Sequence, residues 1–184
     1  MLTGPYTPML FMGEEWGADT PWQYFTDLTD PGLAKAVREG RKAEFAAHGW
    51  AAADVPDPQE EATFLRSRLD WTQPSREPYL GILAWYRELI ALRRARPELT
   101  NPGLDRVSAD FDEDARWIMV RRGRLRIAAN LGPGAVRLLL GQPGTGVLAA
   151  SSPGVAIDQG TVIIPPAAFA VIETRDPAPD KRGA

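Results

Sequence analysis

The sequence has no cysteine and a single histidine, His48. Without cysteine, the chain can form no disulfide, no catalytic thiolate and no cysteine-based zinc site. His48 stands beside Gly49 at the end of an expected helix, which favours a surface or capping role over serine–histidine catalysis. The carboxylates are scattered and show no metal-ligand spacing, so we expect neither a metal nor a cofactor.

The sequence also lacks a long apolar run and a charge excess of either sign. Nothing approaches the ~20 apolar residues that cross a bilayer, and no charged segment with an apolar run behind it opens the chain. A net charge of −3, from 21 basic and 24 acidic residues, gives little attraction for nucleic acid or an anionic membrane. We therefore expect a cytoplasmic protein that binds neither. Four arginines are interpreted as solvated strand faces, with phosphate binding as the alternative: Arg121, Arg122, Arg124 and Arg126.

An apolar stretch that ends in two acids lies near the start, PMLFMGEEWG at residues 8–17. Residues 9–12 form a continuous apolar run, which Gly13 ends. Such a run is typical of a strand buried on both faces, as in a parallel sheet covered by helices. The chain offers this strand no parallel neighbour before it, so we interpret it as one strand of a larger sheet.

Two helices are predicted in the first part of the chain. Asp30 followed by Pro31 indicates an N-cap and a first helical residue, with the helix running to about Ala47. The stretch EPYLGILAWYRELIALRRARPELT, residues 77–100, carries an apolar stripe at helical spacing and is stopped by Pro97.

After Pro102 the apolar period changes from 3.6 to 2, which is typical of strands. GQPGTG at residues 141–146 lacks the Lys-Ser/Thr of a phosphate loop and is interpreted as a hairpin turn. The predicted strands are residues 105–111, 115–121, 124–131, 136–140, 161–164 and 167–173. The third is expected to have one wet face, formed by Arg124, Arg126, Ala128 and Asn130.

The fold class is therefore α/β plus all-β, with a boundary near residue 101. The first part, residues 1–101, consists of strand, helix, long loop and helix. Residues 102–175 form short antiparallel strands at the spacing of a small two-sheet sandwich. Residues 176–184 are expected to be a disordered tail.

Glu14 and Glu15 are the obvious candidates for acid chemistry, but they are adjacent. On an extended chain they point to opposite sides, so at most one can face a given cleft. Glycosidase chemistry needs two carboxyl groups across the scissile bond, ~5 to 5.5 Å apart for retention or ~6.5 to 9.5 Å for inversion. This pair does not meet that need by itself. The alternative is that a glutamate anchors a loop through backbone N–H groups or an arginine.

Aromatic rings mixed with acids and amides follow this pair of glutamates. The mixture suits sugar recognition, because pyranose C–H faces stack on rings while hydroxyls bond to carboxylates and amides. A simply packed loop is the alternative. The long loop at residues 50–77, with RSRLDWTQP, is a second segment that we expect to shape a site. The rings of the first segment are Trp16, Trp22, Tyr24 and Phe25.

Three further segments carry a family resemblance: TPMLFMGEEWGADTPWQYFTD, EGRKAEF and DPQEEATFLRSRLDW. They resemble the C-terminal portion of the malto-oligosyltrehalose trehalohydrolases, within the α-amylase family of glycoside hydrolases. YRELIALRRARPEL resembles the last barrel helix of that superfamily. The resemblance covers residues 5–131 well, and GEEWG alone is shared with glycogen branching enzymes.

The resemblance implies the end of a (β/α)8 TIM barrel followed by an antiparallel β-sandwich. Residues 8–13 would be the eighth strand, residues 14–77 the loop after it, residues 78–96 the eighth helix and residues 103–174 the sandwich. Barrel sites lie at the C-terminal ends of the strands, so the loop would open onto the site. Residues 1–101 would then be the C-terminal, incomplete end of the barrel.

The family reaction is hydrolysis of the α-1,4 bond next to the trehalose unit of maltooligosyl trehalose, a step of trehalose biosynthesis. The family places its nucleophile, acid/base and third carboxylate in motifs after strands four, five and seven, and none of them is matched here. We therefore expect no catalytic residue in this chain, which would be an inactive fragment. Its partners would be maltooligosyl trehalose or a related α-glucan in the complete enzyme, and an upstream-encoded chain that supplies the rest of the barrel.

Two alternatives remain open at this point. One is a fragment of a glycogen branching enzyme or another α-amylase relative. The other is a non-catalytic module that binds carbohydrate or docks on a partner chain. Within the enzyme fragment, the residues expected to border the sugar site, with a loop-anchoring role as the alternative for each, are Glu14, Glu15, Trp16, Phe25, Asp27 and Trp71.

Overall fold

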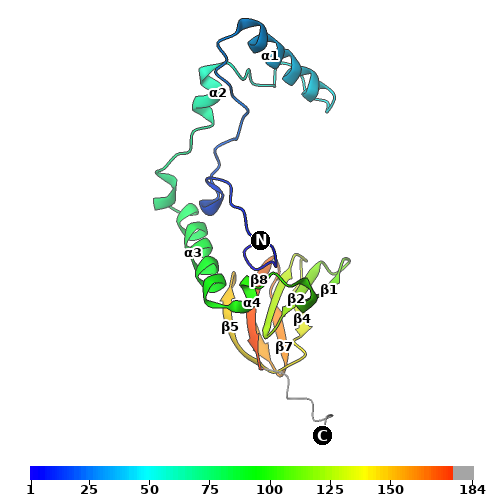
Figure 1. Cartoon of the computed structure of the whole chain (residues 1–184). Helices are drawn as coiled ribbons and strands as arrows, with labels where there is room; N and C mark the ends of the chain where they lie inside the picture. Colours follow the sequence, from blue (N-terminus) through cyan, green and yellow to red (C-terminus); the bar gives the residue numbers. More distant parts are fainter. Residues whose placement is uncertain (176–184) are drawn as a thin grey trace. The chain divides into compact units, whose positions relative to one another are not determined.

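The computed structural model describes residues 1–175 (Figure 1). The chain divides into two compact units. The sheet unit combines Met1–Leu10 with the described chain from Ala84 to Arg175, and the loop unit spans Phe11–Leu83. This division differs from the predicted boundary at residue 101, because residues 84–100 pack on a sheet. The predicted tail, residues 176–184, lies outside the described residues.

The sheet unit is built of two antiparallel sheets, as the alternating pattern predicts. The larger sheet has the strand order β1-β2-β3-β8-β5 and the smaller one β4-β7-β6. Short helical segments precede the strands: α4 (Pro97–Thr100) and η3 (Leu104–Arg106). The strands are β1 (Val107–Asp112), β2 (Trp117–Arg122), β3 (Leu125–Asn130), β4 (Val136–Leu139), β5 (Gly144–Ala150), β6 (Ala156–Asp158), β7 (Thr161–Ile164) and β8 (Ala168–Thr174).

One core lies between the two sheets. Met119 and Ile172 of the larger sheet pack with Leu138 and Ile164 of the smaller one, and all four side chains are buried. Burying such a side chain contributes about 1.5 to 3 kcal/mol relative to leaving it exposed. The two sheets therefore form the expected sandwich.

A second core covers the other face of the larger sheet. Leu125, Ile127 and Val171 pack there against Trp85 and Leu89 of α3 (Tyr79–Ala95). Because both faces of this sheet are covered, β3 has no solvent-exposed face. The predicted exposure is therefore wrong for three residues of β3, all of which are buried: Arg126, Ala128 and Asn130.

The prediction that GQPGTG is only a turn is also wrong, since β5 begins inside it at Gly144. A Cβ on Gly144 would lie 2.9 Å from a Leu140 methyl carbon and 3.0 Å from an Ile157 methyl carbon, so any larger residue here would require these side chains to shift. Glycine is depleted in strands, which explains why the composition concealed β5. The short strand β6 was missed as well.

Two arginines fasten the first residues of the chain to the sheet unit. Arg93 donates from Nη1 to the carbonyl oxygens of Leu2 at 2.7 Å and Gly4 at 2.9 Å. Arg122 is buried and donates to the Thr3 carbonyl at 2.9 Å. The interpretation of Arg122 as part of a solvated face is therefore wrong, because its guanidinium is buried and donates hydrogen bonds to backbone carbonyl oxygens.

The loop unit contains the capped helix that Asp30 and Pro31 predict. The Asp30 Oδ1 atom accepts the Leu33 N–H at 2.7 Å. His48 lies at the far end, with Nδ1 3.0 Å from the Glu44 carbonyl oxygen. The predicted long loop contains two short helices, α2 and η2. The loop unit's elements are η1 (Glu14–Trp16), α1 (Pro31–Ala46), α2 (Glu61–Arg66), η2 (Gln73–Ser75) and the first turn of α3.

Residues 9–12, which we call the apolar segment, form no strand. The prediction of a buried strand at residues 8–13 is wrong for this chain, because no other described segment pairs with this backbone. All four side chains of the apolar segment are exposed, and Met9 is 85% exposed. Separately, no helix among residues 1–175 has the length and apolar character to span a membrane.

Candidate functional site

The two adjacent glutamates sit in a tight turn and bind its backbone. Glu14 Oε2 accepts the Phe11 N–H at 3.1 Å, and Glu15 Oε2 accepts the Gly13 N–H at 3.0 Å. Gly13 has φ +89°, and a Cβ there would lie 2.8 Å from a Leu69 methyl carbon. The turn is therefore fixed in shape, and both glutamates have the anchoring role that was the alternative to acid chemistry.

Trp16 and Trp71 lie against each other but differ in exposure. Their ring centroids are 5.2 Å apart, and Trp16 is 2% exposed whereas Trp71 is 74% exposed. The Trp16 indole N–H donates to Gln73 Oε1 at 3.2 Å. Trp16 is thus a core residue of the loop unit, and Trp71 is the ring that faces solvent.

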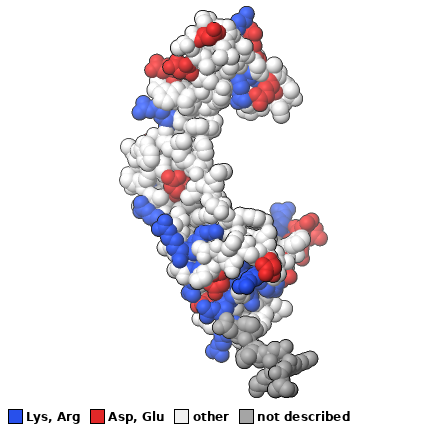
Figure 2. All heavy atoms as spheres, viewed as in Figure 1, with Lys and Arg blue, Asp and Glu red and all other residues white. Residues whose placement is uncertain are grey.

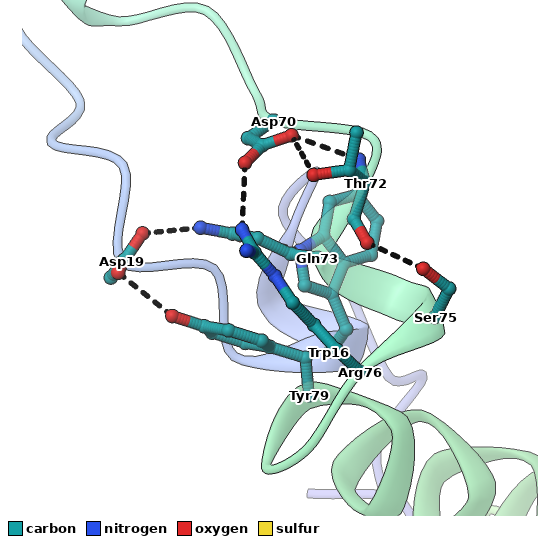
Figure 3. A network of polar contacts seen from close by, with 8 residues as sticks. All are labelled: Trp16, Asp19, Asp70, Thr72, Gln73, Ser75, Arg76 and Tyr79. Carbon is teal, nitrogen blue, oxygen red and sulfur yellow. Dashed lines mark hydrogen bonds and ion pairs between the residues drawn. The ribbon is translucent and has the colours of Figure 1, made fainter.

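A network of polar side chains adjoins this ring pair (Figure 3). The Asp19 carboxylate accepts bonds from the Gln73 side-chain amide and, at 2.8 Å, from the Tyr79 hydroxyl. Arg76 pairs with Asp70 at 3.0 Å, and Asp70 also accepts the Thr72 hydroxyl at 2.7 Å. The network joins η2 and the start of α3 to the segment after η1.

The Asp19 contact predicts a pH effect. The Tyr79 hydroxyl, followed by the Gln73 amide, holds the pKa of the Asp19 carboxyl below its ordinary value of 3.8. A lowered folded-state pKa adds stability above the ordinary value that is lost as pH falls through the lowered one. We expect Tyr79→Phe to raise the Asp19 pKa toward 3.8, measured by carboxyl NMR titration. An unchanged Asp19 pKa in Tyr79→Phe would show that the hydroxyl is not its main cause; Ser75→Ala is the matched control.

Two hollows open on the loop unit. The first, of about 340 Å³, is called the Trp71 hollow, and the second, of about 330 Å³, the Trp50 hollow. Trp22 lines both. The Trp71 hollow is further lined by Met12, Phe25, Phe64, Ser67, Arg68, Leu69 and Trp71. The rings around the Trp50 hollow are Trp22, Tyr24, Phe45 and Trp50.

The structure brings together only some of the predicted site residues. Phe25 and Trp71 line the same hollow, with Trp16 packed behind Trp71. The three predicted acids, Glu14, Glu15 and Asp27, line neither hollow.

Sequence reasoning missed the Asp19 network and the Trp50 hollow. The network pairs residues 54 and 60 positions apart, and no local pattern signals such a pairing. The Trp50 hollow does carry a local signal, because EGRKAEF contributes Arg41 and Phe45 to it.

The charged side chains in view in Figure 2 are mixed in sign, and the hollows of the loop unit are lined mainly by rings. Figure 2 shows basic and acidic groups interspersed over the face in view, with large areas that carry neither. Among residues 1–175, no three His, Cys, Asp or Glu side chains are grouped to hold a metal ion. The two hollows combine aromatic rings with a few polar groups, the composition of a small-molecule site.

Comparison with known proteins identifies relatives over nearly the whole chain. The chain is 47% identical over 171 residues to the malto-oligosyltrehalose trehalohydrolase of Rhizobium sp. (strain M-11), covering 93% of this chain and 28% of that protein. It is 54% identical over 138 residues to the enzyme of that name from Arthrobacter ramosus, covering 74% and 23%. The chain thus spans less than a third of the length of these relatives.

Solved structures and a family model agree with this relationship. A Salmonella typhimurium protein assigned as an α-amylase matches with a TM-score of 0.74 and 35% identity, over 94% of this chain and 29% of that one. The trehalulose synthase MutB matches with a TM-score of 0.60 at 17% identity, over 94% and 36%, and so shares the fold. Residues 102–171 match the family described as a domain of unknown function, DUF3459. The chain is therefore a relative of the malto-oligosyltrehalose trehalohydrolases of the α-amylase family, and it matches their C-terminal portion.

Proposed function

We propose that this chain is the C-terminal part of a glycoside hydrolase that releases trehalose from maltooligosyl trehalose. The observation that carries the proposal is identity of 47% over 171 residues to a protein named for this activity. That match runs through both the loop unit and the sheet unit, so it is not limited to a shared accessory domain.

In this proposal the chain supplies no catalytic carboxylate. Glu14 and Glu15 hold backbone N–H groups, and Asp19 holds Tyr79 and Gln73. Each of these carboxylates accepts hydrogen bonds that hold its own loop, which supports an anchoring role for them in this proposal. The acids of the reaction would come from the other strands of the barrel.

The apolar segment and α3 are the proposed links to that barrel. A segment of exposed apolar side chains has the character of a strand that lacks its neighbours. Pairing on both sides would bury Met9 and Phe11, which are exposed here. The segment that follows, from Gly13 onward, would then lie at the C-terminal end of the strand, where barrel enzymes carry their sites.

The proposed contribution of the loop unit to the site is the Trp71 hollow. Trp71 offers a solvent-facing ring that is backed by Trp16 and so is held in place. Phe25 is fixed from the side by Phe64, with centroids 5.2 Å apart. Rigid rings with an exposed surface suit the apolar faces of sugar units.

A chimera tests this proposal. This chain replaces the matching C-terminal portion of the Rhizobium enzyme, and we expect the chimera to release trehalose from maltooligosyl trehalose while the 184-residue chain alone does not. Formation of α-1,6 branches in place of trehalose would instead identify a branching enzyme. Trehalose release by the chain alone would contradict the proposed absence of catalytic acids.

Trp71→Ala in the same chimera is expected to raise KM about five- to tenfold with little change in kcat. The ring contributes binding that ground state and transition state share, so its loss acts on KM. Phe111→Ala is the matched control, because Phe111 is also an exposed ring but lies on β1 of the sheet unit. Equal KM values in the Trp71→Ala and Phe111→Ala chimeras would show that the Trp71 hollow does not belong to the substrate site.

A further inference from the structure

We propose that the Trp50 hollow is a second binding site for a neutral sugar unit, separate from the Trp71 hollow. It lies between α1 and the segments at residues 21–24 and 50–56. The sequence placed Trp22 and Tyr24 in an aromatic segment that suits sugar recognition, but none of the six residues predicted to border the sugar site lines this hollow. Its rings, its charges and its size carry the argument.

Three rings of the Trp50 hollow are exposed although they are apolar. Trp22 is 58%, Tyr24 48% and Trp50 53% exposed. Two of them are held by edge-to-face contacts: Trp50 with Phe45 at 5.4 Å, and Trp22 with Phe25 at 5.9 Å. Rings that are fixed and exposed bind a flat apolar surface without first losing conformational freedom.

Arg41 provides a fixed polar group in the same hollow. Its guanidinium carbon lies 5.0 Å from the Tyr24 ring centroid and 4.7 Å from the Phe45 centroid. Nη1 also donates to Glu44 Oε2 at 2.7 Å. A guanidinium has five N–H donors in a rigid plane, so Arg41 can donate to ligand hydroxyls while it keeps its contact with Glu44.

The balance of charge favours an uncharged ligand. Arg41 is paired with Glu44, and Asp54 also lines the hollow. An anionic ligand would meet a cation already neutralised and a second carboxylate nearby. A polyol instead finds donors on Arg41, an acceptor on Asp54, and both a donor and an acceptor on the Gln23 amide.

The volume sets the size of the ligand. Small-molecule sites commonly have volumes of about 300 to 1,000 Å³. At about 330 Å³ the Trp50 hollow lies at the lower end of this range, so it suits one or two sugar units and not a long chain. The choice of an α-linked glucan as the ligand class rests on the proposed function.

Tryptophan indole NMR on the complete 184-residue chain tests the site, with maltotriose as the probe. The chain has six tryptophans, whose N–H signals are assigned by single Trp→Phe replacements. We expect saturable shifts of the Trp22 and Trp50 signals, and none for Trp85 and Trp117 of the sheet unit. Trp50→Ala should weaken maltotriose binding at least about tenfold, whereas Trp50→Tyr should retain most of it.

Phe111→Ala is the control for the loss of an exposed ring, and circular dichroism checks that each variant is folded. Shifts at Trp71 with none at Trp50 would overturn this inference and leave the proposed function standing. An unshifted Trp50 signal, or an equal affinity in Trp50→Ala, would overturn it as well. If maltotriose shifts the Trp50 signal but the chimera releases no trehalose, the sugar site stands and only the proposed function is rejected.

Discussion

Replacing Arg122 by alanine is expected to lower the free energy of unfolding of the sheet unit by about 3 kcal/mol. The Arg122 guanidinium donates to the carbonyls of Thr3 at 2.9 Å, Leu99 at 3.4 Å and Asn101 at 2.7 Å. Alanine leaves these acceptors without their donor, and the bonds to Thr3 and Leu99 are buried, where an unsatisfied carbonyl costs about 1 to 3 kcal/mol. The total stays below their sum, because the variant no longer buries a charge.

Urea unfolding followed by far-ultraviolet circular dichroism measures this effect. Arg137→Ala is the matched control, since Arg137 also donates from Nη1, but to an exposed Asp158 at 2.7 Å. Such a surface pair contributes about 0 to 1 kcal/mol. Indistinguishable midpoints for the two variants would mean that water satisfies the carbonyls after Arg122 is removed.

The second large effect is expected in the loop unit, where Trp16→Ala should cost about 3 to 5 kcal/mol. The variant removes a fully buried indole, opens a cavity beneath Trp71 and leaves Gln73 Oε1 without its donor. Hydrogen exchange measured by mass spectrometry separates the units. We expect faster exchange in residues 14–28 and 61–76, with unchanged protection of β3 and β8.

Trp22→Ala is the matched control for this experiment. Trp22 is the same residue type in the same unit, but it is largely exposed and should cost much less. If Trp16→Ala left exchange in the loop unit unchanged, Trp16 would not be its core. Faster exchange of β3 and β8 as well would show that the two units unfold together.

The sequence predicted those elements whose signals are local. Asp30 and Pro31 define the start of α1 by themselves, because a cap needs only its own first turn. The prediction for residues 161–164 matches β7 residue for residue. Alternation fixes which residues of a strand share a face, but not what covers that face. Arg126 and Asn130 were therefore predicted to be exposed, although both are buried.

The same limit applies to the candidate site. The sequence identified the aromatic loop, and Phe25 and Trp71 do line one hollow. It could not distinguish Trp16 from Trp71, since the burial of Trp16 involves residues far from it in the chain, such as Gln73, which is 57 positions away. Exposure of a ring is a tertiary property, and composition reports only that the ring is present.

The exposed apolar segment makes the protein sensitive to oxidants. Met9 and Met12 present their thioethers to solvent, whereas Met119 is buried between the sheets. A mild peroxide is therefore expected to convert Met9 and Met12 to sulfoxides before Met119, and each sulfoxide replaces an apolar side chain with a polar one. Methionine sulfoxide reductases reverse this change. The redox history of a preparation thus decides how much of this segment's apolar character remains.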